Sequence, residues 1–420
     1  MPGRFSRDVA WNLASVCILG VCGFSLNIVI GRYYGAATFG VFSQVLAVYY
    51  ILSQLAVGGL MFSTLNLVAG HHDDREAVRE IITSALILTA ALAFVVCSAA
   101  YGLAGWIGGM FDSAAVRRGI LWVIPGVWCF AVNKILLFSL NGLRHMRLYA
   151  VGNSLRFLLI LASLIALTVL RVDGSLLTLC FSIAEFALLP VLAVSVLREY
   201  PLSLRNARLW SGKHLHFGIR TFFSGLLMDI NLKVDVLLLG YFFSDTVVGV
   251  YNFAAMLAIE GLYQFVVAIQ ANLNPILTRL KLENRTDELK LYVRKATVIL
   301  CPAMAALSCL IGFAYPFITV LLTGTSDFIP GRIYFAVLML GIVIGSSHLP
   351  FLFVLNQWGH PALFTSFLAA IVVTNLALNL LLIPRFGALG SAIGTGLSYI
   401  MTIVYLNVFL RLRPAAAAPA

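Results

Sequence analysis

The sequence predicts an all-α polytopic membrane protein of about twelve transmembrane helices, arranged as two related halves of six. Its 420 residues are 61% hydrophobic and 11% charged, with a mean hydropathy of +0.98, whereas soluble proteins carry about 25% charged residues. Apolar runs long enough to cross a bilayer recur along the whole chain. One short motif also occurs twice, half a chain apart.

The apolar runs give the individual spans, since a transmembrane helix needs about 20 mostly apolar residues. In the first half we expect spans at 9–30, 41–69, 81–104, 118–141, 149–170 and 174–197. In the second half we expect them at 215–242, 247–273, 293–322, 332–355, 361–383 and 388–410.

A polar and basic stretch at 198–214, which contains Pro201, separates the two halves. We therefore expect a first lobe at 1–197, a basic cytoplasmic linker at 198–214 and a second lobe at 215–413. The Ala- and Pro-rich end at 414–420 is of low complexity and is expected to be disordered.

The repeated motif relates the halves. Gly31-Arg-Tyr-Tyr is followed after five residues by Gly40-Val-Phe-Ser, and Gly240-Tyr-Phe-Phe is followed at the same spacing by Gly249-Val-Tyr-Asn. The copies are 209 residues apart (240 − 31), with six helices between them. This predicts a parallel repeat about a pseudo-twofold axis along the membrane normal, with substrate held between the lobes near the midplane.

The basic residues orient the helices. With a cytoplasmic N-terminus, nineteen Lys and Arg fall in cytoplasmic connections and tails, against six on the opposite side. This excess predicts that both termini are cytoplasmic. The net charge of +11 then reflects loop topology and anionic headgroups, not nucleic acid. We expect no cleavable signal peptide, because the first apolar run is too long for one.

Two basic residues are expected inside neighbouring antiparallel spans. Lys134 and Arg156 lie roughly 10–12 Å from the cytoplasmic ends of their helices. Together they can attract a diphosphate. The alternative is that each side chain snorkels to the interface.

The seventh expected span carries three charges. Asp229 and Lys233 are four residues apart and can pair on one face, which could be a purely structural role. Asp235 lies about 200° round the helix from Lys233. Because charge at membrane depth is costly, polar groups on two sides indicate a helix that lines a cavity.

Two glutamates, Glu185 and Glu260, are expected near the midplane in the sixth and eighth spans. A buried carboxylate without a partner can stay protonated at neutral pH. Each is therefore a candidate for proton or Na⁺ coupling, with pairing to an unseen Arg or Lys as the structural alternative.

Catalytic and metal motifs are missing from the sequence. It holds no Gly-x4-Gly-Lys-Ser/Thr, which excludes ATP hydrolysis through a P-loop, and no His-Glu-x-x-His or Gly-x-Ser-x-Gly. Its seven cysteines lie in apolar runs without a Cys-x-x-Cys pair, so they read as small hydrophobic residues. We expect no catalytic residue, no metal site and no cofactor.

Four short stretches carry a resemblance to a known family. They are Arg7-x4-Asn12, Gly31-Arg-Tyr-Tyr-Gly-x4-Gly40-Val-Phe, Asp235-x4-Gly240-x8-Gly249-Val-Tyr-x2-Ala254 and Leu382-Ile-Pro-Arg-Phe-Gly-Ala-Leu-Gly-Ser-Ala392. With these stretches, its length and its twelve-helix layout, the chain resembles the polysaccharide-transporter family. That family includes the O-antigen and exopolysaccharide repeat-unit flippases of the multidrug/oligosaccharidyl-lipid/polysaccharide (MOP) exporter superfamily, to which the MATE transporters also belong.

The resemblance implies a V-shaped, MATE/MOP-like transporter with a cationic cavity and a rocker-switch cycle. Such a protein moves an undecaprenyl-diphosphate-linked oligosaccharide from the cytoplasmic to the outer leaflet of the bacterial inner (cytoplasmic) membrane. H⁺ or Na⁺ coupling and contact with polysaccharide polymerase machinery are expected. The candidate cavity cations are Lys134, Arg156, Lys233 and Arg32, and the candidate coupling or gating residues are Asp229, Glu185, Glu260 and Asp235.

Three other functions are weighed against this one. A cation-coupled drug or metabolite antiporter of the same superfamily is the alternative transporter. A polyprenyl-sugar enzyme needs a sizeable external loop or a metal-binding acidic motif, and the sequence has neither. A scaffold or receptor would leave the two-sided polar character of the seventh span unexplained.

Overall fold

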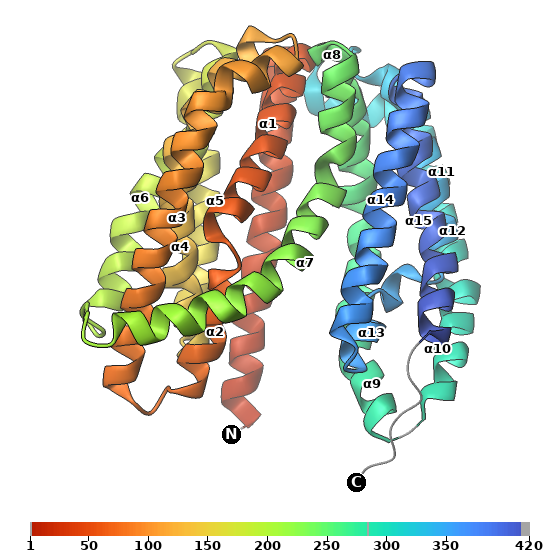
Figure 1. Ribbon diagram of the computed structural model, residues 1–420. Coiled ribbons are helices and arrows are strands. Elements are labelled where there is room, and N and C mark those ends of the chain that lie inside the picture. Colours follow the sequence, from red (N-terminus) through yellow and green to blue (C-terminus); the bar gives the residue numbers. More distant parts are fainter. Residues whose placement is uncertain (1, 284, 413–420) are drawn as a thin grey trace. The chain divides into compact units, whose positions relative to one another are not determined.

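A computed structural model describes residues 2–283 and 285–412. All the secondary structure in these ranges is helical (Figure 1). The helices form two compact units. The first unit comprises the residues up to Tyr34 with Val41–Asp229, and the second comprises Gly35–Gly40 with the residues from Ile230 onward. The expected disordered tail at 414–420 lies outside the described residues.

The first unit is a helix bundle in which α4 packs on α3 and α6, and α5 packs on α6. Leucine, isoleucine and valine side chains of α3, α4 and α6 fill its core together with Trp210 of α7. Its helices are α1 (Pro2–Val57), α2 (Leu60–Gly70), α3 (Arg75–Met110), α4 (Ala114–Gly142), α5 (Met146–Val169), η1 (Gly174–Leu176), α6 (Leu179–Leu197) and the first part of α7 (Ala207–Phe242).

The second unit contains the rest of α7 and packs α15 against α12 and α14. One of its cores surrounds Trp358 and Phe367. Its remaining helices are α8 (Asp245–Ala255), η2 (Met256–Leu262), α9 (Tyr263–Leu282), η3 (Thr286–Glu288), α10 (Leu289–Lys295), η4 (Ala296–Leu300), α11 (Cys301–Thr323), η5 (Ile329–Gly331), α12 (Arg332–Gly345), η6 (Leu349–Phe351), α13 (Val354–Gln357), α14 (Pro361–Phe386) and α15 (Ala388–Arg411).

The all-α polytopic architecture is confirmed, but twelve spans are not. Within the described residues, nine helices are long and apolar enough to cross a membrane, or ten if the bent pair Ile329–Gly345 and Leu349–Gln357 counts as one span. The expected spans 9–30 and 41–69 begin in α1, and the break expected between them falls at Gly35, where two helices within α1 meet at a kink. The expected span 215–242 lies in α7. The charged residues of α7 exclude it from the nine membrane-crossing helices.

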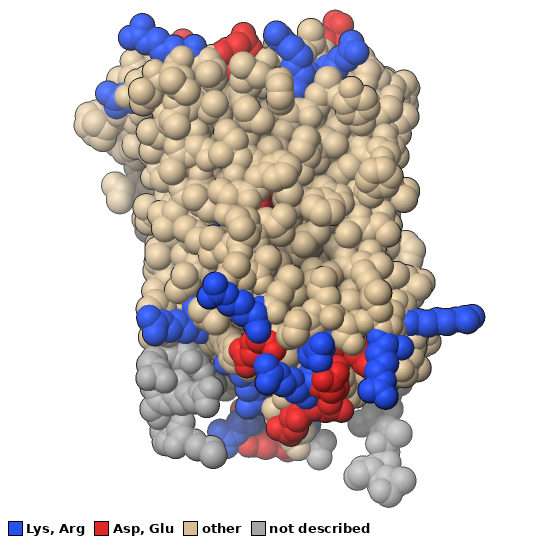
Figure 2. Space-filling view, turned by 90° about the vertical axis from the view of Figure 1, so that its left-hand side faces the viewer, with Lys and Arg blue, Asp and Glu red and all other residues tan. Residues whose placement is uncertain are grey.

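Charged side chains gather at two ends of the molecular face shown in Figure 2. Between those ends lies a broad band that is almost free of Lys, Arg, Asp and Glu. Such a band is typical of a surface in contact with lipid, where unpaired charges are costly. The charge distribution on this face therefore agrees with the apolar helices in assigning the chain to a membrane.

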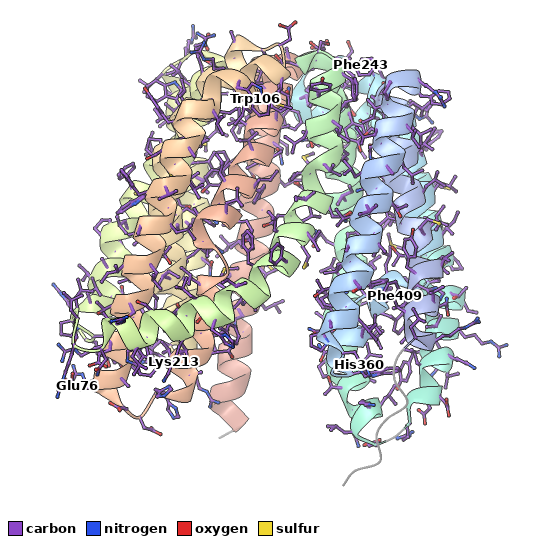
Figure 3. The ribbon with its side chains drawn as sticks, in the orientation of Figure 1. Glu76, Trp106, Lys213, Phe243, His360 and Phe409 are labelled. Carbon is purple, nitrogen blue, oxygen red and sulfur yellow. The ribbon has the colours of Figure 1, made fainter. Side chains whose placement is uncertain are left out.

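The stretch expected as a linker is tied to α3. Arg75 donates to the carbonyl oxygen of Glu199 at 2.7 Å, and Arg79 donates to that of Pro201 at 3.0 Å. The backbone N–H of Ser203 donates to Thr83 Oγ1 at 2.9 Å. The first part of α7 then runs across one end of the first unit (Figure 1). In Figure 3, Lys213 lies at the same end as Glu76, and Trp106 lies at the other end of α3.

The two copies of the glycine motif meet in the second unit. A Cβ on Gly40 would overlap the carbonyl of Asp245, and a Cβ on Gly249 would overlap that of Ala36. Phe39 packs edge-on against Phe253, with ring centroids 6.1 Å apart. Glycines at equivalent positions of the two copies thus meet in one contact, where the absence of side chains permits close approach of two helices.

Candidate functional site

A buried ion pair joins Arg156 of α5 to Glu185 of α6 inside the first unit. The Arg156 side chain is 11% exposed and that of Glu185 is 0% exposed. Asn133 Nδ2 donates to Glu185 Oε2 at 2.9 Å, and Arg156 Nη2 donates to Tyr49 Oη at 3.3 Å. Arg156 is therefore held in the bundle by a carboxylate, which excludes its snorkelling to the interface in this structure.

Aromatic rings surround this pair. The Arg156 guanidinium lies 4.5 Å from the ring centroid of Phe130 and 5.5 Å from that of Phe157. Tyr49 stacks on Phe181 at 5.0 Å. Rings that exclude water strengthen the hydrogen bonds of the pair and add cation–π attraction for the guanidinium.

Lys134 lies beside Asn133 on α4, as expected from the sequence. Its Nζ atom is 5.3 Å from the ring centroid of Phe130 and 5.8 Å from that of Phe138. Arg156, Glu185 and Asp229 are the charges that act on it electrostatically. No carboxylate of the described residues lies within the 4.0 Å limit of an ion pair with Lys134. Lys134 is thus a half-buried cation beside an ion pair that is already neutral.

Lys233 and Glu260 form an ion pair in the second unit, with 3.7 Å between Nζ and Oε1. The Lys233 side chain is 16% exposed and that of Glu260 is 47% exposed. Glu260 is thus half-exposed and pairs with a lysine, which was the structural alternative, and its expected place near the midplane stays a prediction. Glu260 belongs to the π-helix η2, a deviation from α-helical geometry that often occurs at functional sites. The pairing of Lys233 with Asp229 stays a prediction.

Asp235 of α7 is buried, at 4% exposed. Tyr251 Oη donates to its Oδ2 at 2.7 Å, and the N–H of Val236 donates to its Oδ1 at 2.8 Å. Thr395 Oγ1 faces the Tyr251 hydroxyl but makes no hydrogen bond within the described residues. Asp235 is therefore held by a hydroxyl and a backbone N–H, and Lys233 is the charge that acts on it electrostatically.

A chain of amides and a hydroxyl lies in the same unit. Asn375 Nδ2 donates to Asn231 Oδ1 at 3.2 Å, and Asn379 Nδ2 donates to Asn375 Oδ1 at 2.8 Å. Ser391 Oγ donates to Asn379 Oδ1 at 3.0 Å and faces Tyr251. Carboxylate, amide and hydroxyl oxygens are suitable ligands for a hard cation. This arrangement can accept a proton or a small cation.

The sequence analysis missed some of these residues. Asn375 and Asn379 were not among the candidate site residues, and neither were Asn231, Tyr251 and Thr395. A signal existed for Tyr251 and Ser391, because both lie in stretches that carry the family resemblance. The remaining candidate, Arg32 of α1, is exposed and belongs to neither cluster.

Solved structures with similar folds are membrane transporters and a lipid flippase. The lipid II flippase MurJ in its inward closed conformation matches 96% of this chain and 87% of its own at 13% identity, with a TM-score of 0.78. An inward-facing multidrug resistance MATE family transporter of the MOP superfamily matches 95% and 96% at 14% identity, with a TM-score of 0.75. A MOP superfamily transporter from Pyrococcus furiosus matches 97% and 95% at 14% identity, with a TM-score of 0.60.

Sequence comparison gives the family. No curated protein matches the chain in sequence. The profile of a family described as "Polysaccharide biosynthesis protein" matches residues 5–281, which is more than half of the 420 residues. The matched part includes the ion pair of Arg156 and Glu185 in the first unit and the buried Asp235 in the second. The chain therefore belongs to the polysaccharide biosynthesis protein family, and its fold is similar to that of the solved MOP superfamily transporters and of the flippase MurJ.

Proposed function

We propose that this protein flips a polyprenyl-diphosphate-linked oligosaccharide from the cytoplasmic to the outer leaflet of a bacterial inner membrane during surface polysaccharide synthesis. The family match and the fold support a transporter of lipid-linked glycans. The distribution of basic residues supports cytoplasmic N- and C-termini. Alternating access would move the lobes at 1–197 and 215–413 about the linker at 198–214.

The observation that carries this proposal is the position of Lys134. It is a half-buried cation next to Arg156, whose charge Glu185 already balances. A diphosphate entering this site gains Lys134 as a counter-ion, and the planar guanidinium of Arg156 can donate to a second acceptor. When the site is empty, Glu185 prevents repulsion between the two cations. Lys233 and Arg32 would extend the cationic path.

Glu185 and the paired residues Lys233 and Glu260 would act in gating. Protonation of Glu185 would release Arg156 for the diphosphate, and separation of Lys233 from Glu260 would free a second cation. Asp229, which acts electrostatically on Lys134, would tune the same site. The roles of Glu185 and Glu260 follow from ion pairs whose rupture changes the charge offered to the substrate.

Asp235 would couple transport to a proton or Na⁺. It is buried with one hydroxyl and one backbone N–H as hydrogen-bond partners, and the hydroxyl of Thr395 has a free hydrogen-bonding valence within the described residues. A bound cation or proton would balance the carboxylate charge. Its binding and release would bias the transporter between its two states.

Deletion of the gene tests this function. Lipid-linked oligosaccharides are measured in each leaflet, together with surface polysaccharide. We expect undecaprenyl-linked oligosaccharide to accumulate in the cytoplasmic leaflet while the polysaccharide is lost. Normal polysaccharide and an unchanged leaflet distribution, in a strain without a second flippase, would contradict the proposal and favour a drug or metabolite antiporter. Transport by the purified protein would show whether polymerase machinery is needed as a partner.

A further inference from the structure

A groove of about 600 Å³ opens in the second unit and shares no residue with the clusters around Arg156 and Asp235. Its walls come from α10 and η4 on one side and from the end of α15 on the other. Lys290, Arg294 and Arg411 line it, and Asp287 is the single carboxylate among its described lining residues. The lining therefore carries a net charge of +2, counting three cations and one anion.

The three cations are available to a ligand. Lys290, Arg294 and Arg411 are exposed, and none has an ion-pair partner within the ranges that the structure covers. Two other basic residues nearby are engaged in ion pairs. Arg285 pairs with Glu283 and Glu288, and Arg279 pairs with Glu283. The groove thus brings together three basic side chains that no ion pair engages within the described residues.

Both walls change from charged to apolar in the same direction. Lys290, Arg294 and Val298 are four residues apart and follow one stripe, so the wall passes from two cations to an apolar side chain over about 12 Å. On α15, Arg411 follows directly after Leu410, with Leu406 one turn deeper. The charged mouth is thus continuous with an apolar interior.

We propose that this groove binds an anionic glycerophospholipid, with its phosphate between Lys290, Arg294 and Arg411 and an acyl chain along Val298 and Leu410. Val298 is 66% exposed and its neighbour Ile299 is 68% exposed, so the apolar end is open to the hydrocarbon. Basic pockets between transmembrane helices at the cytoplasmic side favour anionic headgroups. Asn407 uses its Nδ2 for His348 and for the carbonyl of Ile403, so it offers its amide oxygen as an acceptor to a headgroup hydroxyl.

Binding to the purified full-length protein in detergent tests this site. The probes are dioleoyl-phosphatidylglycerol, dioleoyl-phosphatidylcholine and inorganic phosphate, and the readouts are native mass spectrometry and the melting temperature. We expect the phosphatidylglycerol to bind and to raise the melting temperature. Equal binding of phosphatidylcholine would overturn the charge recognition. An equal shift with inorganic phosphate would show an anion site without a lipid.

Two sets of variants locate the site. Replacing Lys290, Arg294 and Arg411 by Gln should lower phosphatidylglycerol affinity at least tenfold. The matched control replaces Arg198, Arg205 and Arg208 by Gln, three exposed basic residues of the first unit, and should change affinity less than twofold. Equal losses in both sets would overturn the proposal, because they would indicate non-specific attraction.

A variant of the apolar wall makes the test independent of charge. Val298→Asn should weaken phosphatidylglycerol binding severalfold and leave the melting temperature without lipid unchanged. Unaltered lipid affinity in this variant would contradict the placement of the acyl chain. The melting temperature without lipid also shows whether the triple variants are folded.

Discussion

Gly40 and Gly249 lie so close together that a Cβ on Gly40 would be 2.9 Å from the backbone nitrogen of Gly249, and a Cβ on Gly249 would be 3.0 Å from that of Gly40. The two glycines occupy equivalent places in motifs that are 209 residues apart. Backbone atoms on both sides of the contact cannot move away as a flexible side chain can. The repeated motif therefore relates the two halves of the sequence and also provides a close packing contact.

Replacing either glycine by alanine should destabilise the protein by about 3 kcal/mol or more, because overpacking of this kind forces backbone shifts. Melting temperatures of Gly40→Ala and Gly249→Ala in detergent measure the effect. Gly20→Ala and Gly23→Ala on the same helix are matched controls, since a Cβ there meets no atom within 4 Å. Similar melting temperatures for all four variants would refute the contact.

The buried pair of Arg156 and Glu185 gives a second prediction. Arg156→Met or Glu185→Leu leaves one buried charge uncompensated, which costs about 3–5 kcal/mol. The double variant should recover most of that loss, because neither charge remains. Stability measured by melting temperature in a double-mutant cycle checks this. Additive losses in the double variant would show that the two side chains do not interact.

Lys134 is predicted to act in transport with little effect on stability. Lys134→Gln should lower flipping of the lipid-linked substrate at least tenfold, and Lys134→Arg should retain part of it because the charge remains. Lys213→Gln is the matched control, since this lysine also lies against an aromatic ring, 3.9 Å from the centroid of Trp210. Normal flipping by Lys134→Gln would remove the diphosphate role from this residue.

Hydropathy predicted the helical class and most of the spans, because a helix needs an apolar run of about 20 residues to cross a bilayer. It placed a break at the motif between Gly31 and Gly40, and α1 is kinked there at Gly35. It did not find the break inside the expected span 41–69, where α1 ends and α2 begins at Gly58 and Gly59, because two glycines in an apolar run hardly lower its hydropathy. The seventh span, which the sequence analysis singled out for its three charges, lies in α7, and α7 is not among the nine helices that are long and apolar enough to cross a membrane.

Candidate site residues could be selected from sequence, but their partners could not. Arg156 and Glu185 stood out as charges in apolar runs, yet they are 29 residues apart on different helices, and only the packing of α5 on α6 brings them together. The same holds for Lys233 and Glu260. A neutral partner such as Tyr251 gives no signal of its own, because tyrosine is common in membrane helices.

Asp235 is predicted to carry the dependence of transport on pH or Na⁺. Asp235→Asn keeps the shape of the side chain and removes its charge, so the variant should transport at a rate that no longer varies with either ion. Glu260→Gln is the comparison, because Glu260 is half-exposed and paired with Lys233. Flipping rates in vesicles across pH and Na⁺ gradients measure this. An unchanged ion dependence in Asp235→Asn would place coupling elsewhere.

His214 lies before the expected span 215–242 and is fully buried. Its Nδ1 is 2.9 Å from Ser63 Oγ, and its Nε2 is 3.1 Å from the carbonyl oxygen of Ile81. Because the carbonyl accepts only, Nε2 carries the proton and Nδ1 accepts from the hydroxyl. Burial lowers the pKa of His214 to about 4 from its ordinary value of 6.5.

This lowered pKa predicts that stability falls as the pH drops below about 6.5. In that range the unfolded chain binds a proton at His214 and the folded chain does not, so the stability present at neutral pH is lost progressively toward pH 4. At pH 5 the loss amounts to about 2 kcal/mol. Melting temperatures of the wild type and His214→Gln between pH 7.5 and 5 test this, with His216→Gln, an exposed histidine on the same helix, as the control. We expect the smaller decline in His214→Gln alone, and parallel declines in all three proteins would show that another group is responsible.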